Sequence, residues 1–134
     1  MHPDGWLLVS VGSSCNVCIE ENEMRATVVA IDLDTNETSI FARGLRNTVF
    51  MALHPGTHEV WGTDNGRDLI GDDIPPDDIN IIREGSDYGW PYCYGNRVYD
   101  TDFGEESAER CANTVPSHIE LQAHSAALGL AFVP

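Results

Sequence analysis

The feature that most constrains this chain is a turn-and-strand pattern that occurs twice, 52 residues apart. His2-Pro3-Asp4-Gly5 leads into an apolar run at residues 7–11, and His54-Pro55-Gly56-Thr57 leads into another at residues 60–63. Because a short repeated unit cannot bury its apolar face alone, such units must stack on one another.

Each unit contains short segments typical of β-strands. They are rich in β-branched and aromatic residues, are bounded by turn residues, and lie at 6–11, 26–31, 38–41, 49–53 and 59–63. No segment shows a sustained helical period with caps. The pattern therefore predicts an all-β fold.

About four such strands in a unit of about 50 residues are typical of a β-propeller blade. A second echo, between residues 47–53 and 126–132, indicates the start of a further unit. We expect one partial domain over residues 1–134, with about two blades and the first strand of a third. Closed propellers need about four to eight blades. An apolar strand at 128–134 would also need a partner, so an interior fragment of a longer protein is expected.

The charge of the chain excludes one class of partner. Its formal net charge is −15, from 22 acidic and 7 basic side chains. A surface of this sign repels phosphate backbones, so no nucleic-acid partner is expected. No apolar run approaches the roughly 18 residues of a membrane span, and no signal-peptide pattern stands at the start of the chain.

Four cysteines form two local pairs, Cys15 with Cys18 and Cys93 with Cys111. Disulfides, free thiols and a metal site are all compatible with such pairs, although the spacing lacks the two close pairs of a zinc site. An even number of cysteines in an acidic, glycine- and proline-rich chain favours disulfides and an oxidising compartment. We therefore expect a periplasmic or secreted protein.

Six aspartates fall between Asp64 and Asp78, in a loop shaped by glycines and prolines. Clustered carboxylates repel one another unless a cation lies among them, and oxygen ligands on an irregular loop suit calcium. The alternative is an acidic surface loop. By contrast, residues 32–36 lack the glycine and glutamate of an EF-hand and predict a hairpin turn.

Aromatic residues crowd residues 85–95, interrupted by glycine and proline. Such rings either close a blade core or stack on a sugar, and the sequence does not separate the two. Arg46 opens a strand. At the inner strand of a propeller it would project toward the central channel, where these folds bind ligands.

Five short motifs follow one another along the chain: Val11-Gly12-Ser13, Gly44-Leu45-Arg46-Asn47, Thr63-Asp64-Asn65-Gly66, Asp77-Asp78-Ile79-Asn80 and Asp87-Tyr88-Gly89-Trp90-Pro91. In this order they resemble the motifs of the soluble glucose/sorbosone dehydrogenases, and the resemblance covers nearly the whole chain. The segment 12–18 is most similar to the sorbosone-dehydrogenase-like branch.

The resemblance implies a six-bladed propeller that oxidises an aldose sugar or a sorbosone-like aldehyde with pyrroloquinoline quinone and calcium. Carried over by position, it implies that Arg46, Asn47, Asn65 and His124 contact the cofactor. Arg46 would stabilise negative charge that develops on the quinone oxygens. The electron acceptor is not indicated.

The resemblance also implies two calcium sites. The successive backbone carbonyls of Gly66 and Arg67 would hold the ion beside the cofactor. Asp78 and the carbonyl of Tyr88 would hold a second ion, as in parts of the family.

Three residues depart from what the resemblance implies: Arg67 replaces a usual proline, Val49 replaces a usual glutamine, and Ser13 stands where some members have an aspartate. The general-base histidine of the family is expected upstream of Met1, and its cofactor-clamping basic residues beyond Pro134. The activity is therefore expected of a parent enzyme and not of these residues alone.

Two other functions stay open. One is a non-catalytic, calcium-stabilised propeller that binds a glycan or a protein. The other is a redox protein that uses Cys15 and Cys18, which is disfavoured because no helical pattern follows the pair to lower a thiol pKa.

Overall fold

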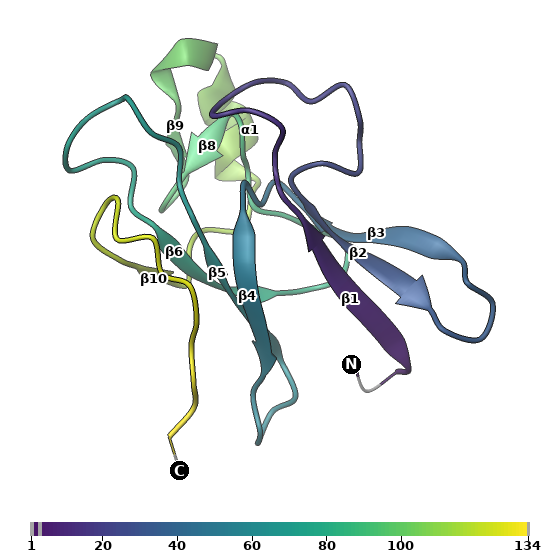
Figure 1. Ribbon diagram of the computed structural model, residues 1–134. Coiled ribbons are helices and arrows are strands. Elements are labelled where there is room, and N and C mark those ends of the chain that lie inside the picture. The colour runs from purple at the N-terminus through teal and green to yellow at the C-terminus, as the bar shows by residue number, and fades with distance from the viewer. Residues whose placement is uncertain (1, 3, 134) are drawn as a thin grey trace.

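The computed structural model describes residue 2 and residues 4–133, which form two four-stranded sheets (Figure 1). In the first sheet the strand order is β1-β2-β3-β7, with β1 at Trp6–Val11, β2 at Thr27–Asp32, β3 at Thr38–Arg43 and β7 at Ser86–Asp87. In the second sheet the order is β10-β6-β5-β4, with β4 at Thr48–Leu53, β5 at Val60–Asp64, β6 at Asp78–Ile82 and β10 at Ile119–Glu120. All pairs are antiparallel except β3 with β7.

The expected all-β fold is confirmed, with one short exception above the sheets. A hairpin of β8 (Cys93–Tyr94) and β9 (Val98–Tyr99) leads through a 3₁₀ turn at Thr101–Phe103 to the helix α1 at Ser107–Ala112 (Figure 1). The sequence pattern missed this helix, because six residues are too few for a hydrophobic period to emerge. In the part of the chain that the structure describes, no helix is long and apolar enough to cross a lipid bilayer.

The 52-residue echo corresponds to a structural match between β1 and β5. His2 and His54 each close the turn before these strands, because the His2 N–H donates to the Trp6 carbonyl and the His54 N–H to the Glu59 carbonyl, both at 2.8 Å. However, β5 is the second strand of its sheet, whereas β1 lies at an edge. In the second sheet β4 lies beside β5. Among the described residues, the first sheet has no corresponding strand beside β1.

The strand expected at residues 128–134 is not formed, since residues 128–133 have no regular structure. A strand is defined by its pairing, and no described strand pairs with this segment. The last residue of that segment, Pro134, and Pro3 of the first turn lie outside the described residues.

The core lies between the two sheets. Strand β2 is buried over its first four residues, and its β-branched Val28 packs with Phe41 of β3 against Val60 and Ile82 of the second sheet. Tyr88 belongs to the same cluster and is 9% exposed. The aromatic segment 85–95 therefore supplies core packing, which is the first of its two expected roles.

Both cysteine pairs form disulfides, Cys15 with Cys18 and Cys93 with Cys111. The second disulfide joins β8 to α1, and its cysteines are 3% and 0% exposed. It therefore fixes the helical cap to the β8–β9 hairpin. Tyr92 packs there against Phe103 and beneath the guanidinium of Arg110.

The two disulfides should contribute unequally to stability. Replacing both Cys93 and Cys111 by serine is expected to lower the free energy of unfolding by about 3 kcal/mol, because that bridge closes the longer loop. The matched replacement of Cys15 and Cys18 is expected to cost about 2 kcal/mol. Guanidinium unfolding of both double variants measures the difference, and a larger loss for the Cys15–Cys18 variant would contradict this assignment.

Candidate functional site

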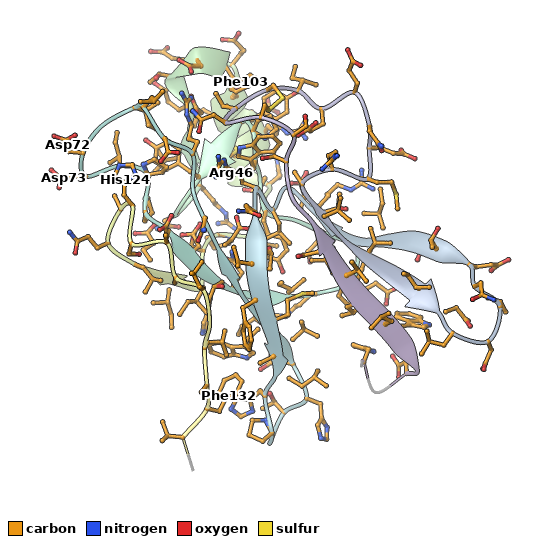
Figure 2. All side chains as sticks on the ribbon, viewed as in Figure 1. Arg46, Asp72, Asp73, Phe103, His124 and Phe132 are labelled. Carbon is orange, nitrogen blue, oxygen red and sulfur yellow. A yellow bond between two sulfur atoms is a disulfide. The ribbon has the colours of Figure 1, made fainter. Side chains whose placement is uncertain are left out.

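The candidate site lies where the segment before β4 meets the long loop between β5 and β6 (Figure 2). Gly44 turns the chain into Arg46 with a φ of +71°, a conformation that other residues rarely adopt. A Cβ at Gly44 would also collide with the Asp87 side chain and the backbone of Gly89. Only glycine therefore fits at the turn that places Arg46 before β4.

Asp64, the last residue of β5, holds the start of β4 in place. It is 7% exposed, and its carboxylate accepts hydrogen bonds from the N–H groups of Arg46 (3.1 Å) and Asn47 (3.0 Å). It accepts a third from the Thr48 hydroxyl at 2.9 Å. Burial raises the pKa of Asp64 to about 6, and these hydrogen bonds act in the opposite direction. Asp64 is therefore mainly ionised at neutral pH.

The Arg46 guanidinium is fixed by four hydrogen bonds. Its Nη1 donates to the backbone carbonyls of Gly66 at 2.9 Å and Asn65 at 3.2 Å. Its Nε donates to the carbonyl of Asn16 at 2.9 Å, and its Nη2 to the Asn16 side-chain oxygen at 3.3 Å. Arg46 is thus brought together with Asn65 and Gly66. Sequence reasoning missed Asn16, because nothing in a Cys-Asn-Val-Cys segment indicates a contact 30 residues away.

Some of the six aspartates between Asp64 and Asp78 are buried and order the loop, whereas others form an acidic surface. Asp77 is buried, and it accepts hydrogen bonds from the N–H groups of Gly66 at 2.8 Å and Ala126 at 2.6 Å. Asp72 and Asp73 are exposed at the tip of the loop (Figure 2). The loop is therefore ordered from its base by buried carboxylates, while its tip is an acidic surface.

Carboxylates at the tip do not gather around a common point. Among the described residues, the single group of three ligand atoms close enough for one metal ion is Cys15, Cys18 and Glu20. Both cysteines are in a disulfide, so their sulfurs are not available as thiolate ligands.

Arg67 anchors the next residue of the loop. Its Nη1 lies 3.0 and 2.8 Å from the two carboxylate oxygens of Asp100 and 2.7 Å from Asp102. The Arg67 side chain is 7% exposed and that of Asp100 is 2% exposed. This buried ion pair fixes the backbone of residue 67. Asp100 was not singled out from the sequence, since isolated acidic residues usually lie on the surface.

Asp78 begins β6 directly opposite Asp64 of β5. Burial, with a smaller contribution from the nearby carboxylates of Asp64, Glu120 and Asp77, raises the pKa of Asp78 to about 7, and the Ser117 side chain acts in the opposite direction. Its Oδ1 is buried without a hydrogen-bond partner. Such an orphaned acceptor is costly unless a cation, a water or a proton satisfies it.

A cavity of about 30 Å³ lies beside Asp78. Its lining includes Asp64, Gly66, Tyr88, Trp90 and Asp100. A cavity needs roughly 10–15 Å³ to hold one water, so the space is large enough for a small ion or a water. The two residues predicted to share a calcium ion, Asp78 and Tyr88, thus line the same cavity. Asp78 also has a side-chain oxygen without a hydrogen-bond partner.

The side chains of Asn65 and Asn47, which are also expected to contact the cofactor, have different surroundings. Asn65 has a buried side-chain oxygen without a partner. The side chain of Asn47 lies against Gly12, where a Cβ would come within 2.9 Å of its Oδ1.

His124 contacts the acidic loop, away from Arg46 (Figure 2). Its Nε2 is 2.8 Å from the Gly71 carbonyl, and its Nδ1 is 3.4 Å from the Asp68 carboxylate. The hydrogen bond to Gly71 raises the pKa of His124, and the charge of Asp68 adds to this rise.

Removal of the Asp64 carboxylate should destabilise the fold strongly. Asp64→Ala leaves three donors without their acceptor, so the free energy of unfolding is expected to fall by about 3–5 kcal/mol. Asp72→Ala, at the exposed tip, is the matched control and should cost less than about 0.5 kcal/mol. Urea unfolding compares the two, and similar small losses would show that Asp64 does not organise this site.

Solved structures with similar folds include two sugar-related enzymes. A calcium structure of a Trichoderma reesei carbohydrate-active enzyme of family AA12 matches with a TM-score of 0.76 and 20% identity, over 92% of this chain and 42% of that one. The soluble aldose sugar dehydrogenase of Escherichia coli, in its apo form, matches with a TM-score of 0.66 and 18% identity, over 92% and 38%. These matches confirm the expected propeller-type fold.

Two uncharacterized proteins are related in sequence. One from Borreliella burgdorferi is 39% identical over 127 residues, which cover 94% of this chain and 33% of that protein. One from Synechocystis is 26% identical over 125 residues, covering 75% of this chain and 29% of that protein. The chain thus spans about a third of the length of the curated relatives that it matches.

The sequence pattern of the Glucose / Sorbosone dehydrogenase family matches residues 17–133, which is most of the chain. The site residues Arg46, Asn65, Gly66 and Asp78 all fall within this match. The chain therefore belongs to the glucose/sorbosone dehydrogenase family.

Proposed function

We propose that this chain is part of a dehydrogenase that oxidises an aldose sugar or a sorbosone-like aldehyde with pyrroloquinoline quinone and calcium. The observation that carries the proposal is the fixed Arg46 guanidinium. It stands before the edge strand β4 and against the carbonyls of Asn65 and Gly66. Because the chain spans about a third of its relatives, the activity is proposed for the parent protein.

Two features support calcium at Asp78 and the Tyr88 carbonyl. The unpaired Oδ1 of Asp78 is a hard oxygen ligand, and the cavity beside it has the volume of a small ion. A cation there would favour the ionised form of Asp78 over the protonated form, which burial favours. The residues present thus fit this ion.

The ion proposed at the Gly66 and Arg67 carbonyls has a further requirement. Arg46 Nη1 donates to the Gly66 carbonyl. That oxygen has a second lone pair for a cation, but the cation would lie beside the guanidinium charge unless this hydrogen bond is released. Arg67 would keep the two carbonyls in place, because its side chain is held by Asp100 and Asp102.

When bound, the quinone would accept a hydride from the sugar carbon while calcium polarises it. Arg46 would place a positive charge where negative charge develops, and its fixed orientation would avoid reorganisation during the reaction. Asn65 would offer its unpaired side-chain oxygen to a donor of the cofactor. Asn47 and His124 are proposed as additional cofactor contacts.

We also propose that the parent protein works in the periplasm or outside the cell. Both cysteine pairs are oxidised, and disulfides persist mainly in such compartments.

The direct test is reconstitution of the full-length parent protein with pyrroloquinoline quinone and calcium. Sugar-dependent reduction of an artificial dye is expected, and it should disappear when a chelator removes calcium. A loaded, folded protein that reduces no dye with any aldose or sorbosone would contradict the proposal and would favour a non-catalytic propeller.

Replacing Arg46 by lysine should impair turnover more than sugar binding. Lysine keeps the charge but lacks the planar donors that fix the guanidinium. The kcat of dye reduction is expected to fall about a hundredfold, with the KM for the sugar little changed. Arg83→Lys is the matched control, because Arg83 is exposed and pairs with Glu59. An unchanged kcat in the Arg46 variant would remove Arg46 from the mechanism.

A further inference from the structure

Asn16 joins two parts of the site that are distant in sequence. Its side-chain Nδ2 donates to the carbonyl of Asp68 at 3.0 Å, and its Oδ1 accepts from the N–H of Asp68 at 2.7 Å. The side-chain amide thus pairs with both polar backbone groups of one residue. Asn16 also accepts the two hydrogen bonds from Arg46 Nε and Nη2. One residue therefore contacts both the guanidinium and the acidic loop.

The segment that carries Asn16 is itself held in place. The Cys15–Cys18 disulfide closes a loop of four residues around Asn16. Immediately before it, the Ser13 N–H donates to the Arg46 carbonyl at 2.8 Å, and the Ser13 hydroxyl donates to the Cys15 carbonyl at 2.7 Å. Residues 13–18, called the Asn16 clamp below, are therefore fixed to the backbone of Arg46 as well as to its side chain.

Separate nitrogens of Arg46 serve the clamp and the acidic loop. Nε and Nη2 contact Asn16, whereas Nη1 contacts the carbonyls of Asn65 and Gly66. The Gly66 contact can therefore be released while Asn16 still holds the guanidinium. A ligand could therefore displace Nη1 from the Gly66 carbonyl while Arg46 stays in position.

Asparagine is well suited to this position. Its amide offers both donors and an acceptor, so it satisfies the N–H and the carbonyl of Asp68 together. An aspartate would lack the donor and would place negative charge against the Asp68 carbonyl. A serine would be too short to bridge Asp68 and Arg46.

We propose that the Asn16 clamp is the positioning device of this site, and that Asn16 orients Arg46 and fixes the acidic loop at Asp68. Its effect on the cofactor rests on the proposed function, whereas its effect on the loop does not. Because the disulfide encloses Asn16, reduction of Cys15–Cys18 loosens the same contacts.

The test uses Asn16→Ala in the full-length protein. The control is Asn113→Ala, because the Asn113 side chain donates to the Glu109 carbonyl on α1 and contacts none of the site residues. Hydrogen–deuterium exchange of the Asp68 amide is the first measurement, since this N–H loses its acceptor. Exchange is expected to be about tenfold faster in the Asn16 variant and unchanged in the control.

The affinity for pyrroloquinoline quinone, measured by titration without substrate, is the second measurement. Asn16→Ala is expected to weaken it about tenfold. In an Arg46→Ala background, the same substitution should cause no further loss, because Asn16 acts through Arg46. The double variant Cys15→Ser/Cys18→Ser keeps Asn16 and should change exchange and affinity in the same direction.

Unchanged Asp68 exchange in both the Asn16 and the cysteine variants would overturn the proposal. If Asn16→Ala lowers the affinity for pyrroloquinoline quinone equally in the wild-type and Arg46→Ala backgrounds, Asn16 does not act by orienting Arg46. If the wild-type protein binds no quinone, the proposed function fails, and the clamp is then decided by Asp68 exchange alone.

Discussion

Two carboxylates that face each other across β5 and β6, the buried Asp64 and the half-buried Asp78, are the constraint on which the site depends. Asp64 and Asp78 occupy paired positions, so their charges repel unless each is compensated. Asp64 is compensated by three donors from the start of β4, and this bonding fixes the backbone of Arg46. Asp78 has one oxygen without a partner. The same pair of residues thus explains a rigid element and lies at the site proposed for a cation.

Around this pair, the loops are held by side chains instead of by regular structure. Arg67 binds Asp100 below the helical cap, Asp77 binds the N–H of Gly66, and Asn16 binds Asp68. Each contact fixes a different residue of the segment 66–68, which carries the carbonyls proposed for calcium. An irregular loop pinned at successive residues in this way loses little entropy when it binds a ligand.

Local patterns predicted the fold well and the site only in part. The first five strands were visible because turn residues bound runs of β-branched side chains, as at β2, and the turn at residues 32–36 was correctly separated from an EF-hand. Strand β6 was missed because Asp78 and its neighbours were interpreted as loop. Arg46, Asn65 and Gly66, which the family resemblance assigns to the cofactor and its calcium ion, lie together. Asn16 and Asp100 were not foreseen, since their roles depend on contacts more than 25 residues away in sequence, which no local pattern encodes.

The central claim is that the unpaired oxygen of Asp78 is a cation ligand. Its most direct test is an anomalous difference map from crystals of the full-length protein grown with calcium. We expect a peak about 2.3–2.6 Å from Asp78 Oδ1, within reach of the Tyr88 carbonyl. A water or an empty cavity at that position, in a protein that holds calcium elsewhere, would contradict it.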